Sequence, residues 1–519
     1  MKTVAEIANK VEAIELRSGD HSTVISSITY DSREVKEGTL FVALRGARFD
    51  GHRFVEAAIE QGAAAVLVAA DYTYSGDREV PFLVAHEPRK ILGELGRFYF
   101  DEPSTEMVMI GITGTNGKTS SAYLLEAIFL AAGRSTGVIG TVEYRWRDKR
   151  VSAPNTTPDG LVLERVLRAM ADDGVEVVIL EVSSHGLELG RVSDLHFDAA
   201  IFTNLSQDHL DFHSSMEAYR DAKRRLFFEI LPNSTTRSGT RPLAVLNLDD
   251  DEGRALLELL ETDDFDETLT LATHSIDGEH HNKASYHLEG KQLEIGLGGI
   301  SMVIEESGGH RFSVESFLPG RFNAENILGV AAAARMLGVS SAAVSAGIGQ
   351  CGGVPGRMQR VGAAERGPAV FVDYAHTPDA LQRGLEMLRP LTSGTVWVVF
   401  GCGGDRDRSK RALMGVVAAK GADRVIITSD NPRWESPDSI IDAIVDGVDA
   451  AVEKGAVVEW ERFVDREEAI SQSIGRAAAD DVILIAGKGH ETYQEINNDR
   501  RDFDDRAVAQ QALSQRGVQ

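Results

Sequence analysis

The stretch GITGTNGKTSS (111–121) lies between an apolar run, MVMIGIT (107–113), and a helical pattern, SSAYLLEAIFLAAG (120–133). Glycines in such a loop let the backbone wrap, so that its N–H groups point inward at a phosphate. Lys118 supplies positive charge to the β- and γ-phosphates, and the Thr119 hydroxyl can reach Mg²⁺. The dipole at the start of the following helix adds to this attraction. A strand, a glycine-rich loop and a helix in this order predict a nucleotide-binding α/β domain.

The loop departs from the usual phosphate-loop pattern in one respect. The pattern places its first glycine five positions before the glycine that precedes the lysine, and that position is Ile112 here. An ordinary strand–helix turn is the alternative. We favour nucleotide binding, because the strand, the glycines, the Lys-Thr pair and the helix all agree. The chain has no Asn-Lys-x-Asp guanine-reading motif and no kinase His-Arg-Asp or Asp-Phe-Gly set, which argues against a GTPase or a protein kinase.

Strand and helix patterns alternate on both sides of this loop. Residues 1–105 mix short strands and helices, and DEPSTE (101–106) resembles a linker. Residues 106–352 alternate in the way that produces a parallel sheet covered by helices. A Gly/Pro break, CGGVPGRMQR (351–360), opens a third block, 353–519, with its own alternation. We therefore expect three α/β domains: a small mixed domain, a central phosphate-loop ATPase-like domain and a C-terminal Rossmann-like domain. In such sheets, ligands bind beyond the carboxyl ends of the strands.

Composition restricts the class of protein further. The chain has 519 residues, a net charge of −26 and two cysteines, Cys351 and Cys402. The acidic balance disfavours a nucleic-acid partner, which needs a basic face. Two cysteines cannot build a disulfide framework or a zinc site. The N-terminal stretch is charged and helical in pattern, unlike a signal peptide, and no apolar run approaches the roughly 20 residues that cross a bilayer. We expect a cytoplasmic monomer with no membrane insertion.

The helical stretch SMEAYRDAKRRLFFEIL (215–231) carries an unusual lysine. Met216, Tyr219, Leu226 and Ile230 form an apolar stripe with one gap, which Lys223 fills. The pattern places Lys223 on the buried face, where burial favours the neutral amine. A neutral amine can react with CO₂ to form a carbamate, an anionic oxygen ligand. The alternative is a lysine whose ammonium reaches the surface.

A strand-type run in the third block, RVIITSD (424–430), ends in DNPRWESP (430–437). Pro432 fixes its own φ and pushes Asn431 out of helical space. The pattern therefore holds Arg433 and Trp434 on a stiff turn at a strand end. Taken alone, this could be a proline turn with a solvated arginine. Trp434 could pack under the turn or line a pocket.

An ordered set of motifs continues from the phosphate loop to residue 494. The set resembles the Mur ligase family, the ATP-dependent amide-forming enzymes of peptidoglycan synthesis, and within it the branch that adds meso-diaminopimelate. Its members are TGTNGKT (113–119), NTTPDG (155–160), LEVSSHGLELGR (180–191), TNLSQDHLDFH (203–213), GRFNAEN (320–326), VPGRMQR (354–360), DYAHTPD (373–379), FGCGGDRDRSKR (400–411), DNPR (430–433) and GKGHETYQ (487–494).

The resemblance implies a reaction. The family activates a free carboxylate of its substrate with ATP as an acyl phosphate, and an incoming amine then displaces phosphate. The substrates implied are UDP-N-acetylmuramoyl-L-alanyl-D-glutamate and meso-diaminopimelate, with Mg²⁺ as cofactor. Rival functions are ligation of L-lysine or another diamino acid, a folate-polyglutamate or D-alanyl-D-alanine-adding ligase, and a non-catalytic carbohydrate- or nucleotide-binding protein. Retention of Glu181, Lys223 and His209 argues against the last of these.

The resemblance also implies roles for individual residues. Catalysis falls to Lys118, Lys223, His209 and Glu181, with Mg²⁺ held by Thr119, Glu181, His209 and Lys223 as the carbamate. The positions implied for ATP are Gly114, Thr115, Asn116, Gly117, Lys118, Thr119, Ser120, Asn323, Arg357, Asp373 and His376. Those implied for the UDP-muramoyl peptide are Ser32, Ala47, Arg48, Phe49, Asn155, Thr156, Thr157, Ser183 and Arg191, with Leu189 where the family has glutamine.

The third block is implied to bind diaminopimelate. This amino acid differs from L-lysine by one distal carboxylate, which a fixed, planar guanidinium recognises well. Arg433 meets that need, lysine-adding relatives lack it, and an unpartnered cation would also reject lysine. The Asn431 amide can add a donor beside Arg433, and Glu491 can accept the distal ammonium. The positions implied for this ligand are Arg406, Asp430, Asn431, Pro432, Arg433, Gly487 and Glu491.

Overall fold

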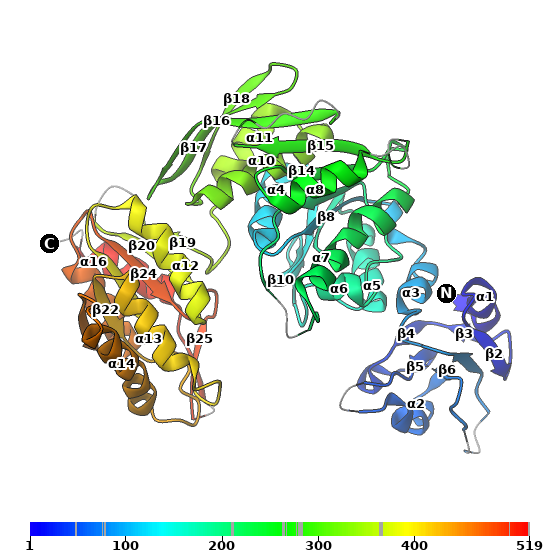
Figure 1. Ribbon diagram of the computed structural model, residues 1–519. Coiled ribbons are helices and arrows are strands. Elements are labelled where there is room, and N and C mark those ends of the chain that lie inside the picture. The colour runs from blue at the N-terminus through cyan, green and yellow to red at the C-terminus, as the bar shows by residue number, and fades with distance from the viewer. Residues whose placement is uncertain are drawn as a thin grey trace. The chain divides into compact units, whose positions relative to one another are not determined.

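The computed structural model describes residues 1–46, 49–74, 76, 79–208, 212–261, 265, 267–276, 278, 284–362, 367–497 and 499–516 (Figure 1). The chain forms two compact units. The first contains Met1–Glu289, Glu306–His310 and Glu325–Gly347, and the second contains Gly290–Glu305, Arg311–Ala324 and Ile348–Gln519. No helix in the described part of the chain is both long and apolar enough to cross a membrane.

The first unit begins with a small mixed sheet, as the sequence predicted. Its strand order is β2 (Glu15–Ser18), β7 (Phe82–Ala85), β6 (Ala63–Ala69), β5 (Thr39–Val42) and β4 (Ser27–Thr29). Strands β4 to β7 pair in parallel, and β2 is antiparallel to β7. Helices α1 (Val4–Lys10), α2 (Val55–Glu60) and α3 (Leu92–Tyr99) accompany it, and β1 (Lys2–Thr3) pairs with β3 (Val24–Ile25). Apolar clusters lie on both faces of this sheet.

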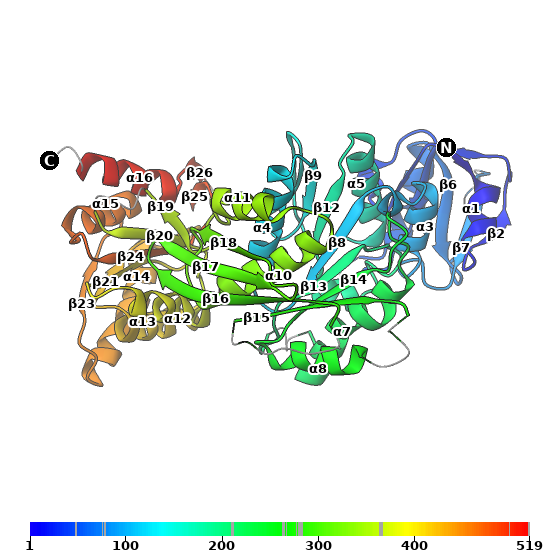
Figure 2. The same ribbon diagram turned by 90° about the horizontal axis from the view of Figure 1, so that it is seen from above.

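The central sheet contains the strand that leads into the phosphate loop. Its order is β11 (Lys149–Ser152), β10 (Glu143–Trp146), β9 (Thr136–Ile139), β12 (Val177–Glu181), β8 (Val108–Thr113), β13 (Ala199–Phe202), β14 (Leu243–Asn247), β15 (Thr270–Ser275), β16 (Tyr286–Gly296), β17 (Gly299–Glu306) and β18 (Arg311–Ser316). From β9 to β16 the pairing is parallel. Figure 2 shows β8, β12, β13 and β14 side by side. These four strands are apolar up to their last residue because both faces of the sheet are buried.

Helices cover both faces of the central sheet. One face packs against α5 (Gly160–Asp172), α8 (Asp251–Leu260) and the π-helical turn Leu226–Ile230, which continues α7 (Met216–Arg225). Helix α4 (Lys118–Ala131) contacts β8, β9 and β12. Helices α10 (Arg321–Met336) and α11 (Ser341–Gln350) complete the layer with α4, because Gly329 of α10 approaches Ile201 and Gly347 of α11 approaches Ile128.

The connection between the first two sheets is packed. Asp101–Glu106, expected as a linker, contains a 3₁₀ turn, Pro103–Thr105. The Ser104 side chain is buried, and its hydroxyl accepts a hydrogen bond from the backbone N–H of His196 at 3.3 Å. Helices α3 and α5 also pack closely. The first two sheets therefore belong to one compact unit.

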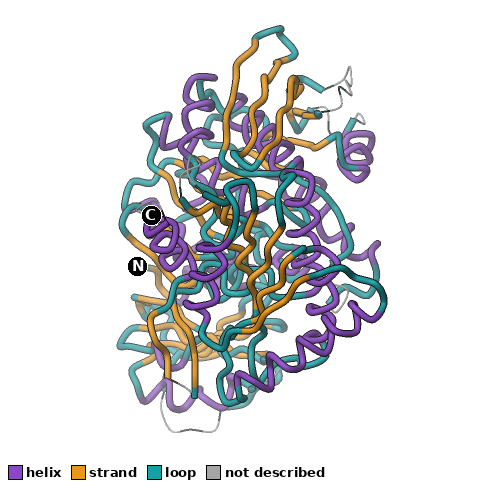
Figure 3. The backbone as a smooth tube through the Cα atoms, turned by 90° about the vertical axis from the view of Figure 1, so that its left-hand side faces the viewer, coloured by secondary structure: helices purple, strands orange, loops and turns teal. Residues whose placement is uncertain are grey.

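The second unit contains the Rossmann-like sheet. Its order is β19 (Gln359–Val361), β20 (Ala369–Asp373), β24 (Val482–Ala486), β21 (Val396–Phe400), β22 (Arg424–Ile427) and β23 (Glu459–Arg462), all parallel except the β19 edge. Helices α12 (Pro378–Leu388), α13 (Lys410–Gly421) and α14 (Pro437–Glu453) pack on one face, and α15 (Arg466–Arg476) and α16 (Asp505–Arg516) on the other. Figure 3 shows these strands in orange between purple helices. Two hairpins, β17 (Gly299–Glu306) with β18 (Arg311–Ser316) and β25 (Tyr493–Ile496) with β26 (Asp499–Asp502), complete the strands.

Candidate active site

The phosphate loop follows β8 and is braced by the segment after β13. The Thr115 N–H donates to the Asn204 carbonyl at 2.8 Å, and the Asn116 N–H donates to the Asn204 side-chain oxygen at 3.0 Å. Gly117 has φ +86°, and a Cβ there would lie 2.4 Å from Oδ1 of Asn326. A side chain at this position would be strained and would clash, so glycine is required. The loop has the strand, turn and helix that the sequence predicted.

Two lysines converge on one carbonyl of this loop. Nζ of Lys118 donates to the carbonyl oxygens of Gly114 (2.8 Å) and Thr115 (2.9 Å). Nζ of Lys223 donates to the same Gly114 oxygen at 2.7 Å. Burial, and secondarily the nearby Lys118 ammonium, hold the pKa of Lys223 well below its usual range, although the Asp208 carboxylate acts in the opposite direction. The neutral amine is the form that this environment favours.

Lys223 is buried for the reason that the helical stripe predicted. Helix α7 is capped by the Ser215 hydroxyl, and its inward face carries Tyr219 and continues to Leu226. The Lys223 side chain is 3% exposed. Its Nζ lies 4.6 Å from the centroid of the Tyr219 ring. The alternative, a lysine whose ammonium reaches solvent, is wrong.

Glu181 ends β12, beside the start of the phosphate loop. Its backbone pairs with Ile112, and the residue is 1% exposed. Oε2 accepts hydrogen bonds from the hydroxyls of Thr119 and Thr141, both at 2.9 Å, and the Thr141 N–H donates to Oε1 at 3.2 Å. In the described ranges, the carboxylate forms no ion pair with a lysine or an arginine. A buried anion without a cation is costly, so this position suits a bound cation.

The residues implied for the muramoyl peptide form a network around Glu181. The Thr157 hydroxyl donates to the Glu181 carbonyl at 2.9 Å and lies 3.0 Å from the Ser183 hydroxyl. The Arg191 guanidinium donates to the Thr157 carbonyl at 2.7 Å and lies 3.0 Å from the Asp159 carboxylate. The hydroxyl of Thr156 lies 3.1 Å from that of Thr141, and the Asn155 carbonyl accepts from the Tyr144 hydroxyl. Leu189 is 48% exposed.

A hollow in the same unit lies next to this network. It has a volume of about 260 Å³ and is lined by Tyr30 and Asp31 from the first block and by Tyr144 and Pro154 from the second. Ser32 begins the 3₁₀ turn that follows Asp31, and Pro154 precedes Asn155. The hollow therefore connects part of the implied uridine diphosphate site with part of the implied peptide site. Phe49 is exposed, and Ala47, Arg48 and His209 lie outside the described residues.

In the second unit, the DNPR turn lies at the end of β22. Arg433 has φ +52°, a left-handed conformation that is uncommon for a residue with a side chain. Its N–H donates to the Glu495 carbonyl at 3.1 Å, and its carbonyl accepts from the Asn497 N–H at 2.7 Å. Its guanidinium donates to the Gly404 carbonyl at 2.7 Å and lies 3.5 Å from the Glu495 carboxylate. These hydrogen bonds anchor the turn, and this arginine already has a carboxylate neighbour.

A second carboxylate holds the loop after β21 against this turn. Glu435 accepts from the Asp405 N–H at 2.6 Å and pairs with Arg411 (2.9 Å) and Arg408 (3.1 Å). The hydrogen bonds from Arg411 and then from Asp405 lower the pKa of Glu435 to about 2. A Cβ on Gly403 would lie 3.0 Å from the Arg433 guanidinium and 3.7 Å from the Arg406 side chain, so the two implied carboxylate-binding arginines flank one glycine.

Trp434 and Asn431 of this turn differ in burial. Trp434 is 69% exposed, so it does not pack under the turn. Asn431 is buried, and its Nδ2 donates to Glu491 at 2.9 Å. Its Oδ1 accepts from Nζ of Lys488 and from the Glu495 N–H, both at 3.0 Å. The amide is therefore part of a network that the sequence did not predict.

Three of the ATP positions implied for the second unit, Arg357, Asp373 and His376, lie around Tyr374. Asp373 ends β20, accepts from the Met358 N–H at 2.6 Å, and has a pKa raised by burial. The Tyr374 ring lies 5.3 Å from the Arg357 guanidinium and 4.5 Å from the His376 ring, centroid to centroid. Asn323 of this unit donates to the Pro319 carbonyl at 2.7 Å. The Gly487 N–H donates to the Asp373 carbonyl at 3.1 Å, which joins this group to the diaminopimelate positions.

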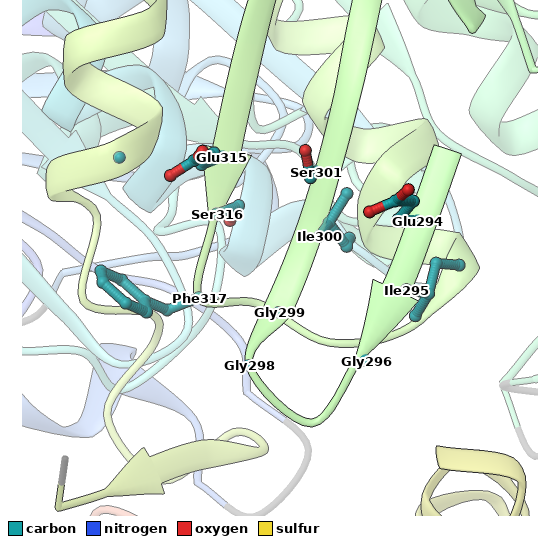
Figure 4. A pocket seen from close by; sticks show the side chains of 11 residues that line it. Glu294, Ile295, Gly296, Gly298, Gly299, Ile300, Ser301, Glu315, Ser316 and Phe317 are labelled. Carbon is teal, nitrogen blue, oxygen red and sulfur yellow. The ribbon is translucent and has the colours of Figure 1, made fainter. Parts of the chain in front are cut away.

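Another hollow of about 440 Å³ lies at the base of strands β16 to β18 (Figure 4). Glu294, Ile300, Glu315 and Phe317 are among the residues that line it. None of the residues implied for ATP, the muramoyl peptide or diaminopimelate lines it. The chemistry is therefore assigned to the strand ends and not to this hollow.

Some residues of the two networks were not predicted from the sequence. These are Thr141, Asn204, Asn326, Glu435, Lys488 and Glu495. A signal existed for three of them. Lys488 lies between two glycines directly after a strand, and Asn204 and Asn326 are part of the quoted motifs TNLSQDHLDFH and GRFNAEN. The others act through hydrogen bonds that only the folded chain reveals.

Comparison with known proteins agrees with this geometry. Three family models match: the Mur ligase family catalytic domain over residues 24–98, the Mur ligase middle domain over 112–334 and the Mur ligase glutamate ligase domain over 356–489. The UDP-N-acetylmuramoyl-L-alanyl-D-glutamate–2,6-diaminopimelate ligase of Geobacillus kaustophilus is 42% identical over 494 residues, 95% of this chain and 96% of its own length. The enzyme of that name from Streptomyces coelicolor is 40% identical over 508 residues, 98% and 96% of the two chains.

A solved structure gives the same result. The structure described as a UDP-N-acetylmuramoyl-L-alanyl-D-glutamate–2,6-diaminopimelate ligase superimposes with a TM-score of 0.70 at 34% identity, and the match covers 99% of each chain. The relatives thus match along nearly the whole sequence, including both networks described above. The chain belongs to the Mur ligase family.

Proposed function

We propose that this protein uses ATP to join meso-diaminopimelate to UDP-N-acetylmuramoyl-L-alanyl-D-glutamate in peptidoglycan synthesis. The observation that carries the proposal is that the turn bearing Arg433 is tied to Glu491, because Asn431 of the same turn donates to the Glu491 carboxylate at 2.9 Å. The distal end of diaminopimelate has both a carboxylate and an ammonium. A guanidinium and a carboxylate held at one site match those two charges.

The first unit supplies the phosphate-binding part of the reaction. The loop Gly114–Ser120 would hold ATP through its backbone N–H groups, and Lys118 would leave its loop carbonyls to contact the β- and γ-phosphates. Thr157, Ser183 and Arg191 would hold the muramoyl peptide, whose reacting carboxylate belongs to D-glutamate. Because Thr157 contacts the Glu181 backbone, the peptide and phosphate sites share one rigid network.

A divalent cation fits the Glu181 position. Its buried carboxylate and the Thr119 hydroxyl are hard oxygen ligands, which Mg²⁺ prefers. When bound, Mg²⁺ would neutralise the developing charge on the transferring phosphoryl group. Lys223, as the carbamate formed from its amine and CO₂ with loss of a proton, would add an anionic oxygen beside the loop. We also assign His209 to this site.

The reaction balances in two steps. A carboxylate oxygen of D-glutamate attacks the γ-phosphorus of ATP, which breaks the bond to ADP and leaves an acyl phosphate. The neutral amine of diaminopimelate then attacks the acyl carbon, inorganic phosphate leaves, and the amine loses a proton as the amide forms. Excluding water protects the acyl phosphate from hydrolysis. Asn323, Arg357, Asp373 and His376 would complete ATP binding.

Ligation of L-lysine is the second candidate, because lysine carries the same attacking amine. Three features favour diaminopimelate: the two arginines that flank Gly403, the names of relatives 40% to 42% identical to this chain, and the left-handed Arg433. A backbone conformation that is uncommon for a side-chain-bearing residue points to a positional requirement.

A phosphate-release assay tests the proposal. The purified chain is given ATP, Mg²⁺ and the nucleotide-linked dipeptide, together with meso-diaminopimelate or L-lysine. Phosphate should appear with diaminopimelate and depend on both the dipeptide and the amine. Phosphate release that does not depend on the dipeptide or on the amine, or that is faster with L-lysine, would contradict the proposal.

We also infer three functional blocks, 1–105, 106–352 and 353–519, which the three family matches support. The chain acts as a monomer in the cytoplasm. In the part of the chain that the structure describes, both cysteines are buried and neither forms a disulfide, as suits a reducing compartment.

A further inference from the structure

Lys488 is a fully buried cation in the diaminopimelate site. It follows β24 and Gly487, and its side chain is 0% exposed. Gly487 has φ +115°, and a Cβ there would lie 2.5 Å from the Asp430 carboxylate. The backbone can therefore pass this close to Asp430 only at a glycine, and Lys488 continues into the interior.

The ammonium of Lys488 closes a ring of three polar side chains. Its Nζ lies 3.0 Å from Oδ1 of Asn431 and 3.2 Å from Oε2 of Glu491. Nδ2 of Asn431 donates to the same Glu491 oxygen at 2.9 Å. The ring fixes the Asn431 amide, because its oxygen must face the cation and its nitrogen the carboxylate.

This ring decides which groups remain for a ligand. Oε2 of Glu491 accepts hydrogen bonds from both Asn431 and Lys488, whereas Oε1 receives no donor from the residues that the structure describes. The positive charge of Lys488 also offsets the negative charge of Glu491. A ligand ammonium therefore meets a carboxylate that is already compensated, and its attraction to the site is weaker than a free glutamate would give.

We propose that Lys488 is a specificity-determining residue that weakens the site for an amino acid whose distal end is only an ammonium. The inference rests on the proposed function, since it concerns the choice between diaminopimelate and L-lysine. Diaminopimelate brings a carboxylate with its ammonium, so its distal end can satisfy both the cations and the acid. L-Lysine brings a further cation to the site without the distal carboxylate that would offset it.

Two substitutions with opposite expected effects test the role of Lys488. Lys488→Met keeps the volume and removes the charge, so Glu491 becomes an unpaired carboxylate. The ratio of kcat/KM for diaminopimelate to that for L-lysine should then fall by about tenfold or more. Glu491→Gln keeps the shape and leaves Lys488 unpaired, and the same ratio should rise by about threefold or more.

The controls separate a role in specificity from a structural role. Lys420→Met, at an exposed position in the last turn of α13, should leave the ratio of kcat/KM for diaminopimelate to that for L-lysine unchanged. KM for ATP and for the dipeptide should stay within about twofold in all variants. If Lys488→Met does not fold, the change of the same ratio in Glu491→Gln still tests the proposal. Equal losses with both amines, or a ratio that stays constant in the folded variants, would overturn the proposal. A wild-type chain inactive with diaminopimelate would instead refute the proposed function.

Discussion

Nζ of Lys223 lies 2.7 Å from the Gly114 carbonyl oxygen, the same atom that Nζ of Lys118 contacts at 2.8 Å. Two amines on one acceptor cannot both be charged without strong repulsion. Lys118 lies at the start of α4, where a phosphate would favour its charged form, and Lys223 is deeply buried. Lys223 is therefore the one that should be neutral and open to CO₂.

Replacing Lys223 tests this assignment. Lys223→Ala should lower kcat by about 100-fold or more, because a misplaced cation or phosphoryl group loses its alignment. If the carbamate is the active form, acetate or formate should restore part of the activity by occupying the vacated space. Activity is measured by phosphate release with saturating diaminopimelate. Arg220→Ala, on the same helix but partly exposed, is the control and should be nearly silent. Full activity of Lys223→Ala would contradict the assignment of Lys223 as a catalytic carbamate.

Glu181 should control the requirement for Mg²⁺. Glu181→Gln keeps the hydrogen-bonding shape but removes the charge, so the Mg²⁺ concentration for half-maximal activity should rise by about tenfold or more. The measurement is a Mg²⁺ titration of phosphate release at fixed ATP. Glu188→Gln, at an exposed position at the end of α6, should leave the titration unchanged. An unchanged titration in Glu181→Gln would remove this residue from the metal site.

The features that sequence predicted share a physical reason. Apolar strand runs, the glycine-rich loop and the stripe that places Lys223 inside are local patterns, and local geometry determines them. Lys488 and Asn431 lie 57 positions apart, and their contact depends on how two strand ends meet in space. From the sequence, the Asn431 amide could be assigned only as a possible donor beside Arg433. Periodicity could not show that this amide already forms hydrogen bonds with Glu491 and Lys488.

Arg433 should determine binding of the amine substrate. Arg433→Ala removes the planar fork, so KM for diaminopimelate should rise by about 100-fold, whereas KM for ATP should hardly change. Removal of a partner that acts only in binding should affect kcat less than KM. Arg424→Ala, on β22 and paired with Glu459, is the matched control. Equal increases in KM for all three substrates would show instead that the turn had collapsed.

Glu164 should make the stability of the first unit depend on pH. It lies on α5, facing α3, and both of its oxygens are buried without a hydrogen-bond donor among the described residues. Burial, followed by the nearby Asp194 carboxylate, raises the pKa of Glu164 to about 8. Arg97 acts in the opposite direction and Glu102 adds a smaller increase, while Glu94 faces Asp194.

The sign of the effect follows from proton binding. Between about pH 4.5 and 8, the folded state keeps a proton on Glu164 that the unfolded state has lost, so the free energy of unfolding falls as pH rises. The loss across this window is about 3 to 5 kcal/mol. In Glu164→Gln the neutral amide removes this loss, so the variant should gain stability relative to the wild type as pH rises. Thermal unfolding from pH 5 to pH 9 measures the difference, with Asp172→Asn at the exposed end of α5 as control. If the melting temperatures of the wild type and Glu164→Gln change in parallel from pH 5 to pH 9, Glu164 is already ionised in the folded protein.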